Sequence, residues 1–352
     1  MKAFISATGN VSPQKTFGEA PLQELVEQKG NRLRCVEPDY LQYIDAKAIR
    51  RMSRIIKMGT AAAMDCLKDA GVQNPDAIVM GTAYGCLEDT GVFLRKMAEQ
   101  NEEMLTPTAF IQSTHNTIGA QIALLLQCHN YNNTFVHRGF SFESALLDAM
   151  MLMEEGAAKN VLTGAADEIT DYSHAILSRF GLYKTASDTT NTNLYTADTK
   201  GTIAGEGAAF FLLSKESTAK DMAVLEAVHT FYKPASVADS KKEIENFLAA
   251  QSIAIEDIDL LIMGANGDAK EDAVYNEISK NLFVKTSNIG YKNLCGEYPT
   301  STAFALWLAV VIAKTGSIPS IIDSASSKSI KKILVYNHYQ NIHHSLMLVS
   351  AC

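Results

Sequence analysis

Short apolar stretches alternate with segments of helical periodicity along the whole chain. Ala77–Gly81 (AIVMG) is an apolar run that ends in glycine, which is typical of a buried strand. Ala46–Ala70 instead places its apolar residues at helical spacing. Strands that alternate with helices favour an α/β protein whose sheets are mostly parallel and lie beneath helices.

The other expected elements follow the same two patterns. The remaining strands are expected at Lys2–Ala7, Asn133–Val136, Val161–Gly164, Ala208–Leu213, Val224–Thr230, Leu260–Gly264 and Ser345–Ser350. The remaining helices are expected at Ala120–Leu126, Ser144–Glu155, Lys241–Ala250, Glu271–Ser279 and Ser301–Lys314. Ser214–Asp221 is the most charged stretch in mid-chain and predicts a boundary between two halves.

Composition excludes several classes of function. The net charge is −8 and no long basic run occurs, so a nucleic-acid partner is not expected. The six cysteines are scattered without a C-x-x-C pair, which indicates a reducing cytoplasm and no metal site. The longest apolar run, Ala303–Ala313, is too short to span a bilayer, and the N-terminus lacks the apolar core of a signal peptide. We therefore expect a cytoplasmic protein without membrane insertion.

Several stretches, taken in their order and spacing, resemble the β-ketoacyl-acyl-carrier-protein synthases of the thiolase superfamily. Arg50–Gly71 resembles their R-R-M-x-R…L-x-D-A-G helix, and Leu152–Glu168 resembles their L-x-x-G-x-x-D-x-x-L-A-G-G-x-E segment. Gly205-Glu206-Gly207-Ala208 matches their G-E-G-A block, which is the most specific of these motifs. The matches together cover essentially the whole chain.

The resemblance implies a thiolase-like fold, a five-layered α/β/α/β/α sandwich of two pseudo-symmetric halves. The halves would be residues 1–215 and residues 216–352. In this family a cysteine at the N-terminus of a buried helix is the nucleophile. Two histidines from the second half stabilise the thioester oxyanion and assist decarboxylation of the malonyl unit.

The three positions that match this catalytic triad hold other residues. Counting back from Gly156, which matches the glycine ending the nucleophile helix, places the cysteine position at Gly139. The histidine of the H-G-T-x-T-…-E motif is replaced by Asn266, and the histidine of the K-x-x-x-G-H motif by Glu297. Glycine offers no nucleophile, asparagine cannot carry a proton, and a carboxylate would repel an oxyanion. Condensation by this chain alone is therefore not expected.

Positions around the triad give a mixed picture. Lys292 and Glu277 match residues that form a buried ion pair in the family, so the same pair is expected here, with solvated positions as the alternative. The segment 338–343 replaces a glycine-rich loop that gates the acyl pocket, and its bulky residues predict a narrowed or filled pocket. Ser141 and Cys295 lie near the triad positions and are interpreted as a helix cap and a small buried residue.

An intact scaffold without its triad resembles the chain-length factor of type II polyketide and polyene systems. That subunit pairs with an active ketosynthase and shapes the acyl tunnel at the interface. The expected partners are an active ketosynthase homologue and an acyl-carrier protein, whose phosphopantetheine leaves this chain without a cofactor of its own. Two alternatives stay open. One is an acyltransferase, condensing or decarboxylating enzyme with displaced residues, and the other is a homodimeric acyl-binding or carrier-binding module.

The resemblance also implies a docking surface for the acidic carrier protein. Lys47, Arg50 and Arg51 match basic residues with which family members meet the carrier, and their spacing brings them together on a helix. A local basic cluster is informative in a chain of net charge −8.

A second surface is expected where two subunits meet. In the family the strand before the nucleophile pairs antiparallel with the same strand of the partner. Here that strand would include Thr134, Phe135 and Val136, which are β-forming residues at an open edge. Phe110 and Ile111 lie in the segment that would reach the partner's acyl pocket, so their size would influence product length.

Overall fold

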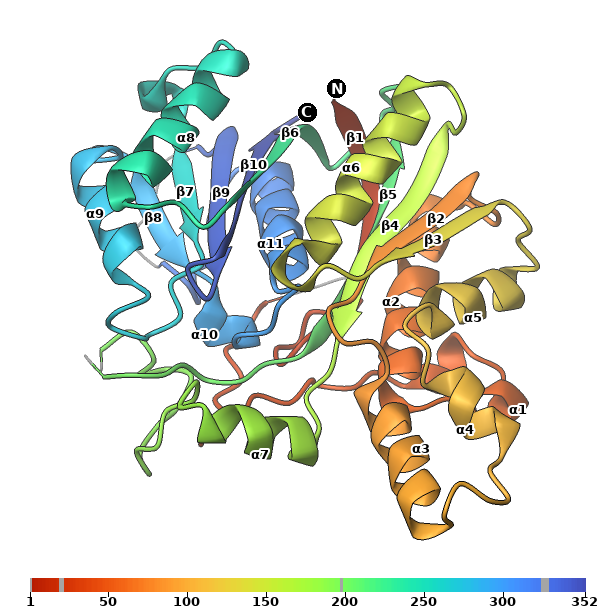
Figure 1. The fold of residues 1–352 in the computed structure, drawn as a ribbon. Helices are drawn as coiled ribbons and strands as arrows, with labels where there is room; N and C mark the ends of the chain where they lie inside the picture. Colours follow the sequence, from red (N-terminus) through yellow and green to blue (C-terminus); the bar gives the residue numbers. More distant parts are fainter. Residues whose placement is uncertain (1, 19–21, 197–198, 324–328) are drawn as a thin grey trace.

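A computed structural model describes residues 2–18, 22–196, 199–323 and 329–352. In these ranges ten strands form one sheet in the order β3-β2-β4-β5-β1-β6-β10-β9-β7-β8 (Figure 1). The strands of the first half are β1 (Ala3–Val11), β2 (Ala77–Gly81), β3 (Tyr131–Phe135), β4 (Asn160–Asp167) and β5 (Gly207–Ser214). The strands of the second half are β6 (Ala223–Tyr232), β7 (Leu260–Met263), β8 (Ser287–Gly290), β9 (Lys332–Tyr339) and β10 (His343–Ser350).

The two halves of the sheet have the same topology. The order β3-β2-β4-β5-β1 is repeated in the other half as β8-β7-β9-β10-β6. In each half the outer three strands are parallel, and the next strand, β5 or β10, runs antiparallel to both of its neighbours. The halves are joined where β1 pairs antiparallel with β6. The expectation of mostly parallel sheets is therefore wrong, because β5 and β10 return directly alongside the strand before them.

Helices divide the molecule into layers (Figure 1). The helices α2 (Arg54–Ala70) and α5 (Thr117–Leu126) cover the outer face of the first half, and α8 (Val237–Ala250) and α9 (Ala273–Asn281) cover that of the second. Between the half-sheets lie α6 (Ser141–Glu154) and α11 (Thr302–Thr315), whose apolar side chains share one core with strands of both halves. The predicted α/β/α/β/α sandwich of the thiolase fold is confirmed.

Further helices and short turns in the described ranges were not expected from the sequence. They include the helices α3 (Leu87–Glu99), α4 (Pro107–Gln112), α7 (Asp171–Arg179) and α10 (Lys292–Cys295), and the 3-10 turns η1 (Tyr40–Gln42), η2 (Arg138–Phe140) and η3 (Ile255–Asp257). The helix expected at 46–70 is interrupted, because α1 (Ala46–Ile49) ends before Ser53 adopts an extended conformation and α2 begins. The break interrupts the helix but not the apolar spacing of the sequence, because Met52, which lies in the break, is buried.

The strands β8 and β9 were also missed. β9 turns into β10 through a tight hairpin in which Gln340 and Asn341 have φ values of 54° and 50°. Hairpin turns of this kind usually carry glycine, and residues 340–342 contain none, so this turn could not be recognised from the sequence. No helix in the described ranges is long and apolar enough to cross a membrane. The apolar run Ala303–Ala313 lies inside α11, in the central layer.

Candidate functional site

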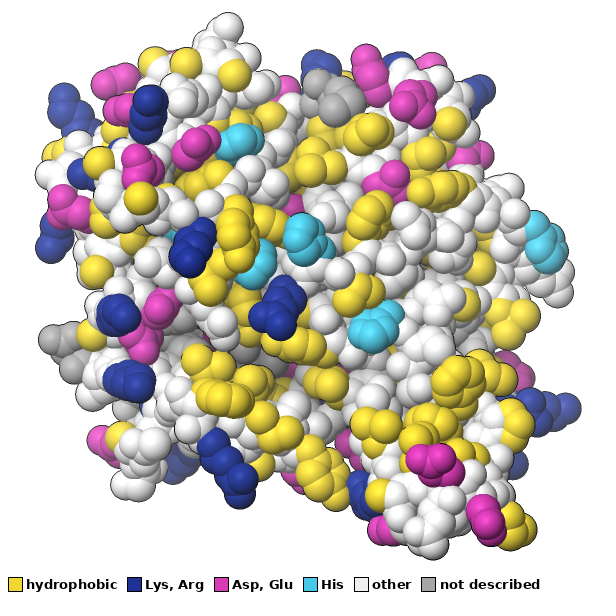
Figure 2. All heavy atoms as spheres, in the orientation of Figure 1, with side chains coloured by type: hydrophobic (Ala, Val, Ile, Leu, Met, Phe, Trp, Pro, Cys, Tyr) yellow, Lys and Arg dark blue, Asp and Glu magenta, His cyan; other side chains and the backbone are white. Residues whose placement is uncertain are grey.

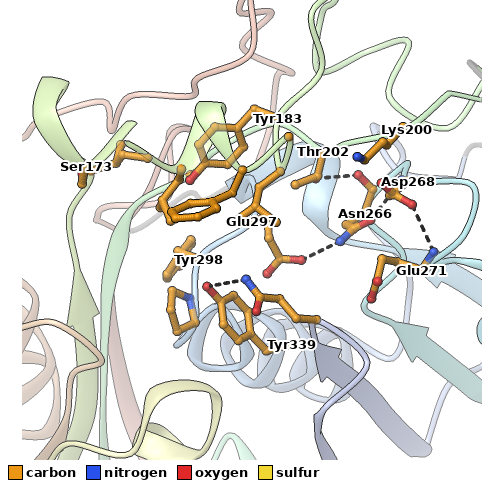
Figure 3. Close-up of a pocket in the computed structure, with 18 of the residues that line it drawn as sticks. Ser173, Tyr183, Lys200, Thr202, Asn266, Asp268, Glu271, Glu297, Tyr298 and Tyr339 are labelled. Atoms are coloured by element: carbon orange, nitrogen blue, oxygen red, sulfur yellow. Dashed lines mark hydrogen bonds between the residues drawn. The ribbon is translucent and has the colours of Figure 1, made fainter. Parts of the chain in front are cut away.

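The two positions that match the catalytic histidines lie side by side. Asn266 follows β7, and Glu297 follows the short helix α10 (Lys292–Cys295). The Asn266 side-chain amide donates to Glu297 Oε2 at 2.9 Å (Figure 3). Lys292 Nζ donates to Glu297 Oε1 at 2.5 Å and to Ser301 Oγ at 2.8 Å. The Lys292 side chain is fully buried, so these groups form a closed polar cluster within the protein.

This cluster changes what the site can do chemically. Condensation needs hydrogen-bond donors aimed at a developing oxyanion. Here a carboxylate occupies one of the two positions, and it accepts from the Asn266 amide at the other. The Lys292 ammonium is directed at the same carboxylate. The donors therefore stabilise Glu297 instead of a substrate oxyanion.

The predicted ion pair between Lys292 and Glu277 is wrong. Glu277 is about half exposed and pairs with Lys241 on α8, with 3.6 Å between Nζ and Oε1. The buried face of α9 carries Val274, Tyr275 and Ile278, so position 277 faces outward. Lys292 is buried as expected, but its partner is Glu297.

The nucleophile position is filled from the second half. Gly139 is buried in η2, just before α6. A Cβ atom added to Gly139 would lie 2.7 Å from the Cβ of Tyr339 and 3.0 Å from the Cβ of His343. The hairpin β9–β10 therefore packs directly on the glycine Cα and leaves no room for a cysteine. The bulky segment 338–343 fills this space, as its sequence predicted.

The two nearby candidate nucleophiles have structural surroundings. Ser141 Oγ accepts from His137 N–H and donates to the Arg138 carbonyl, each at 2.8 Å, so it closes the turn before α6. Cys295 is fully buried, and burial raises the pKa of its thiol well above the ordinary range. A buried thiol without a nearby base is unreactive.

A cavity of about 550 Å³ lies beside the histidine positions (Figure 3). Its walls come from α7, the loops after β2, β4 and β7, the Glu297–Pro299 turn and the tip of the β9–β10 hairpin. The residues along these walls include Tyr84, Leu87, Glu168, Ile169, Ser173, Leu177, Phe180, Tyr183, Lys200, Asn266, Asp268, Lys270, Glu271, Glu297, Tyr298, Tyr339 and Ile342. Gly139 is not one of its lining residues, whereas Tyr339, which packs on Gly139, is one of them.

The helix α7 was the part of this site that sequence reasoning missed. Thr170 and Ser173 form a reciprocal capping box at its start, with Thr170 Oγ1 accepting from Ser173 N–H at 3.1 Å. A threonine cap followed by apolar residues at helical spacing could have revealed the helix. Its outer face exposes Tyr172, Ile176 and Phe180 beside the cavity.

Carboxyl groups set the electrostatic character of the cavity. Burial raises the pKa of Glu168 to about 7. Burial also raises the pKa of Glu271, and the carboxylates of Asp268 and Glu297 raise it further. The negative charges of Asp268 and Glu297 that disfavour ionisation of Glu271 would act against a malonyl carboxylate in the same way, although Lys200 and Lys270 on the wall offset part of this charge.

The expected pairing strand β3 forms one edge of the sheet. Thr134 and Phe135 are half-buried on it, whereas Val136 is 48% exposed. On α4, Phe110 and Ile111 are 56% and 62% exposed. Figure 2 shows apolar side chains gathered around α4. The predicted pairing residues are thus all at least partly exposed.

The predicted carrier-docking residues are exposed. Lys47 lies on α1, Arg50 is its C-terminal cap and Arg51 follows directly. They therefore lie on a short helix and a turn, and the long helix that was expected to carry them is absent. The Arg51 carbonyl accepts from the side chain of Gln112, which ties this turn to α4. Within the described ranges none of the three side chains forms an ion pair.

One family model matches the first part of the chain. Residues 27–187 match the family model of the β-ketoacyl synthase N-terminal domain. A search of curated protein sequences finds no match to the chain.

Solved ketosynthase structures superpose on the whole chain. The ishigamide ketosynthase/chain length factor matches with a TM-score of 0.81 at 16% identity, covering 100% of this chain and 99% of that one. The ketosynthase ApeO in complex with its chain length factor ApeC, from Xenorhabdus doucetiae, matches with a TM-score of 0.76 at 14% identity, covering 99% and 98%. A β-ketoacyl synthase from Burkholderia phymatum matches with a TM-score of 0.74 at 13% identity, covering 100% and 99%. At these identities the likeness establishes the ketosynthase fold.

Proposed function

We propose that this chain is a non-catalytic subunit of the chain-length-factor type, which pairs with an active ketosynthase homologue in fatty-acid, polyketide or polyene biosynthesis. The observation that carries the proposal is the loss of all three catalytic positions, Gly139, Asn266 and Glu297, from an otherwise retained ketosynthase fold. Two of the similar structures contain a ketosynthase with a chain length factor, which supports this role. We place the pair in the cytoplasm.

The surroundings of the triad positions argue against an enzyme with displaced catalytic residues. Such an enzyme needs a nucleophile and donors for the oxyanion. Tyr339 and His343 fill the space at Gly139, and Ser141 is engaged in a turn.

The partner surfaces agree with a role in an assembly. The β3 edge with Phe110 and Ile111 on α4 offers apolar area next to unpaired backbone groups. Lys47, Arg50 and Arg51 offer an exposed basic surface to an acidic carrier protein. In this arrangement the carrier brings the phosphopantetheine arm, and this chain needs no cofactor of its own.

Co-expression with a ketosynthase homologue that carries the full Cys/His/His set, encoded next to this chain, tests the proposal. We expect the two chains to co-elute in size-exclusion chromatography. Substituting Phe110 and Ile111 by alanine should then lengthen the product, because space opens beside the partner's pocket. A matched control is Val284→Ala, which truncates an apolar side chain that is 70% exposed in the second half. Separate elution together with unaltered product length would contradict the proposal and favour a homodimeric binding module.

A further inference from the structure

The cavity of about 550 Å³ beside α7 has a size typical of sites for small molecules. Its first-half wall includes Tyr84 and Tyr183, and its second-half wall includes Tyr298 and Tyr339. Tyr183, Tyr298 and Tyr339 are each exposed by 7% or less, and Figure 3 shows them around one space. The walls therefore offer aromatic surface to an occupant from both halves of the chain.

The charged side chains on these walls differ in depth. Glu168, Asp268 and Glu297 are each exposed by 9% or less. Lys200 and Lys270, which are the two lysines on the walls, are both exposed. Exposed ammonium groups are solvated and screened by salt, so they compensate a buried carboxyl group only weakly. The buried part of the described wall therefore carries carboxyl groups and no ammonium group.

Two of the buried carboxylates are already bonded within the protein. Glu297 accepts from the side chains of Lys292 and Asn266. Asp268 Oδ1 accepts from two backbone N–H groups of the turn that follows it, at 3.0 and 3.2 Å. These two groups have little remaining capacity to bind a ligand.

Glu168, which directly follows β4, has such capacity. Its Oε1 accepts from Glu88 N–H at 3.0 Å, and its Oε2 has no hydrogen-bond partner among the described residues. The nearby Arg54 guanidinium is engaged by Glu206, at 2.7 Å to each carboxylate oxygen. Burial raises the pKa of Glu168 to about 7, and the carboxylates of Asp89 and Glu206 raise it more than Arg54 lowers it. A cation beside Glu168 would therefore be favoured.

A second carboxyl group with an unbonded oxygen, Glu271, lies on the second-half wall. His338 Nδ1 is 3.7 Å from Glu271 Oε2, but it accepts from Asn341 N–H at 3.1 Å and so has no proton to donate. Burial raises the pKa of Glu271, and the carboxylates of Asp268 and Glu297 raise it more than the neighbouring lysine lowers it. The surroundings of Glu271 thus also favour a cation over an anion.

We propose that this cavity binds a small primary amine with an apolar, preferably aromatic, body, and that the ammonium group of the ligand pairs with Glu168. The ammonium group donates to the unbonded Oε2, while the tyrosine rings contact the body of the ligand and favour its positive charge. This site goes beyond the proposed pairing with a ketosynthase, because its walls belong to one chain.

Three ligands with one body and different head groups test the proposal on the lone chain. Phenylbutylamine, phenylbutanol and phenylbutyrate carry a cationic, a neutral and an anionic head group at neutral pH. Isothermal titration calorimetry should show the amine binding at least about tenfold more tightly than the alcohol, and the carboxylate binding most weakly. Binding of the alcohol or the carboxylate as tight as that of the amine would overturn the proposal, as would the absence of saturable amine binding.

Glu168→Gln tests the assigned partner of the ammonium group, because glutamine keeps the shape of the side chain and can still accept from Glu88 N–H. The variant should lose the preference for the amine, while its affinity for the alcohol stays unchanged. The matched control is Glu88→Gln, which removes the same charge from an exposed side chain and should keep the preference.

If Glu168→Gln does not fold, Glu271→Gln takes its place and should reduce the preference for the amine several-fold. A preference retained by the variant that folds, or lost equally in Glu88→Gln, would overturn the proposal. Neither result depends on a partner chain, so the proposed function stands or falls separately.

Discussion

The two halves of the sheet share one strand order, but they end in different kinds of edge. At the second-half edge, Tyr195 lies over the end of β8, and its hydroxyl oxygen would be 2.5 Å from a Cβ added to Gly290. The Tyr195 hydroxyl also accepts from Asn293 N–H at 3.2 Å. At the first-half edge, Val136 at the end of β3 is 48% exposed, and Phe110 and Ile111 on α4 are exposed as well.

The centres of the two halves differ as well. In the first half Gly139 is packed by the β9–β10 hairpin and has no functional group. In the second half the Glu297 carboxylate accepts hydrogen bonds from the side chains of Asn266 and Lys292. In both halves the residues at the triad positions are thus packed by neighbouring side chains or hydrogen-bonded to one another.

The largest expected effect concerns the polar centre of the second half. Lys292→Met would leave the Glu297 carboxylate buried without its counter-charge, and we expect a loss of about 3–5 kcal/mol in the free energy of unfolding. The double variant Lys292→Met/Glu297→Gln should recover much of this loss, because no uncompensated charge remains. Chemical denaturation of the three proteins measures both values. If the single variant is as stable as the wild type, the ion pair does not stabilise the second half.

A pH dependence should arise on the first-half side of the central layer. Glu143 on α6 is fully buried, and burial raises its pKa to about 7. As the pH rises, the carboxyl group therefore loses its proton at a lower pH in the unfolded state, where its pKa is ordinary, than in the folded state. The stability contributed by this group is full below pH of about 4.5 and is lost as the pH rises toward about 7, by a total of about 3 kcal/mol.

Glu143→Gln distinguishes the contribution of Glu143 to this pH dependence from that of Glu168, because burial also raises the pKa of Glu168 to about 7. The difference in unfolding midpoint between Glu143→Gln and wild type should grow in favour of the variant between pH 5 and pH 8. A difference that stays constant over this range would show that Glu143 is ionised in the folded protein.

A smaller effect should separate the two edges. Val136→Arg places a charge beside β3, and we expect it to weaken pairing with the partner at least tenfold, or about 1.4 kcal/mol. Val284→Arg, just before β8, makes the same substitution at another exposed valine and should leave pairing unchanged. Analytical ultracentrifugation of the mixed chains compares the two. Equal weakening by both variants would remove the distinction between the edges.

The smallest expected effect is at the basic surface. Charge reversal of Arg50 and Arg51 should weaken carrier-protein binding several-fold at low salt, and the difference should shrink as salt rises. Reversal of Lys314, in the last turn of α11, provides a control at a distant basic residue. Unchanged carrier affinity after reversal of both arginines would reject the docking surface.

The fold could be predicted from sequence where short-range patterns were decisive. β2 occupies the expected Ala77–Gly81, and α11 lies within one residue of the expected 301–314. β9 was missed because Gln340 and Asn341 make its turn without glycine. The break before α2 was missed because burial of Met52 preserves the helical pattern across it.

The site could be predicted in part. Asn266 and Glu297 were assigned from separate motifs, and the structure places them in hydrogen-bond contact. Glu277 was assigned by counting along a motif, which does not fix which face of α9 is buried. The packing of Tyr339 on Gly139 depends on how the second half folds over the first, which no local pattern specifies.

Intact-mass spectrometry tests the central claim most directly. The chain is incubated with acyl-loaded carrier protein, first alone and then with its ketosynthase partner. We expect the mass of this chain to stay unchanged in both cases, and the partner alone to gain the acyl group, because Gly139 offers no nucleophile and Cys295 is a buried thiol. Stable acylation of this chain at any residue would contradict the account.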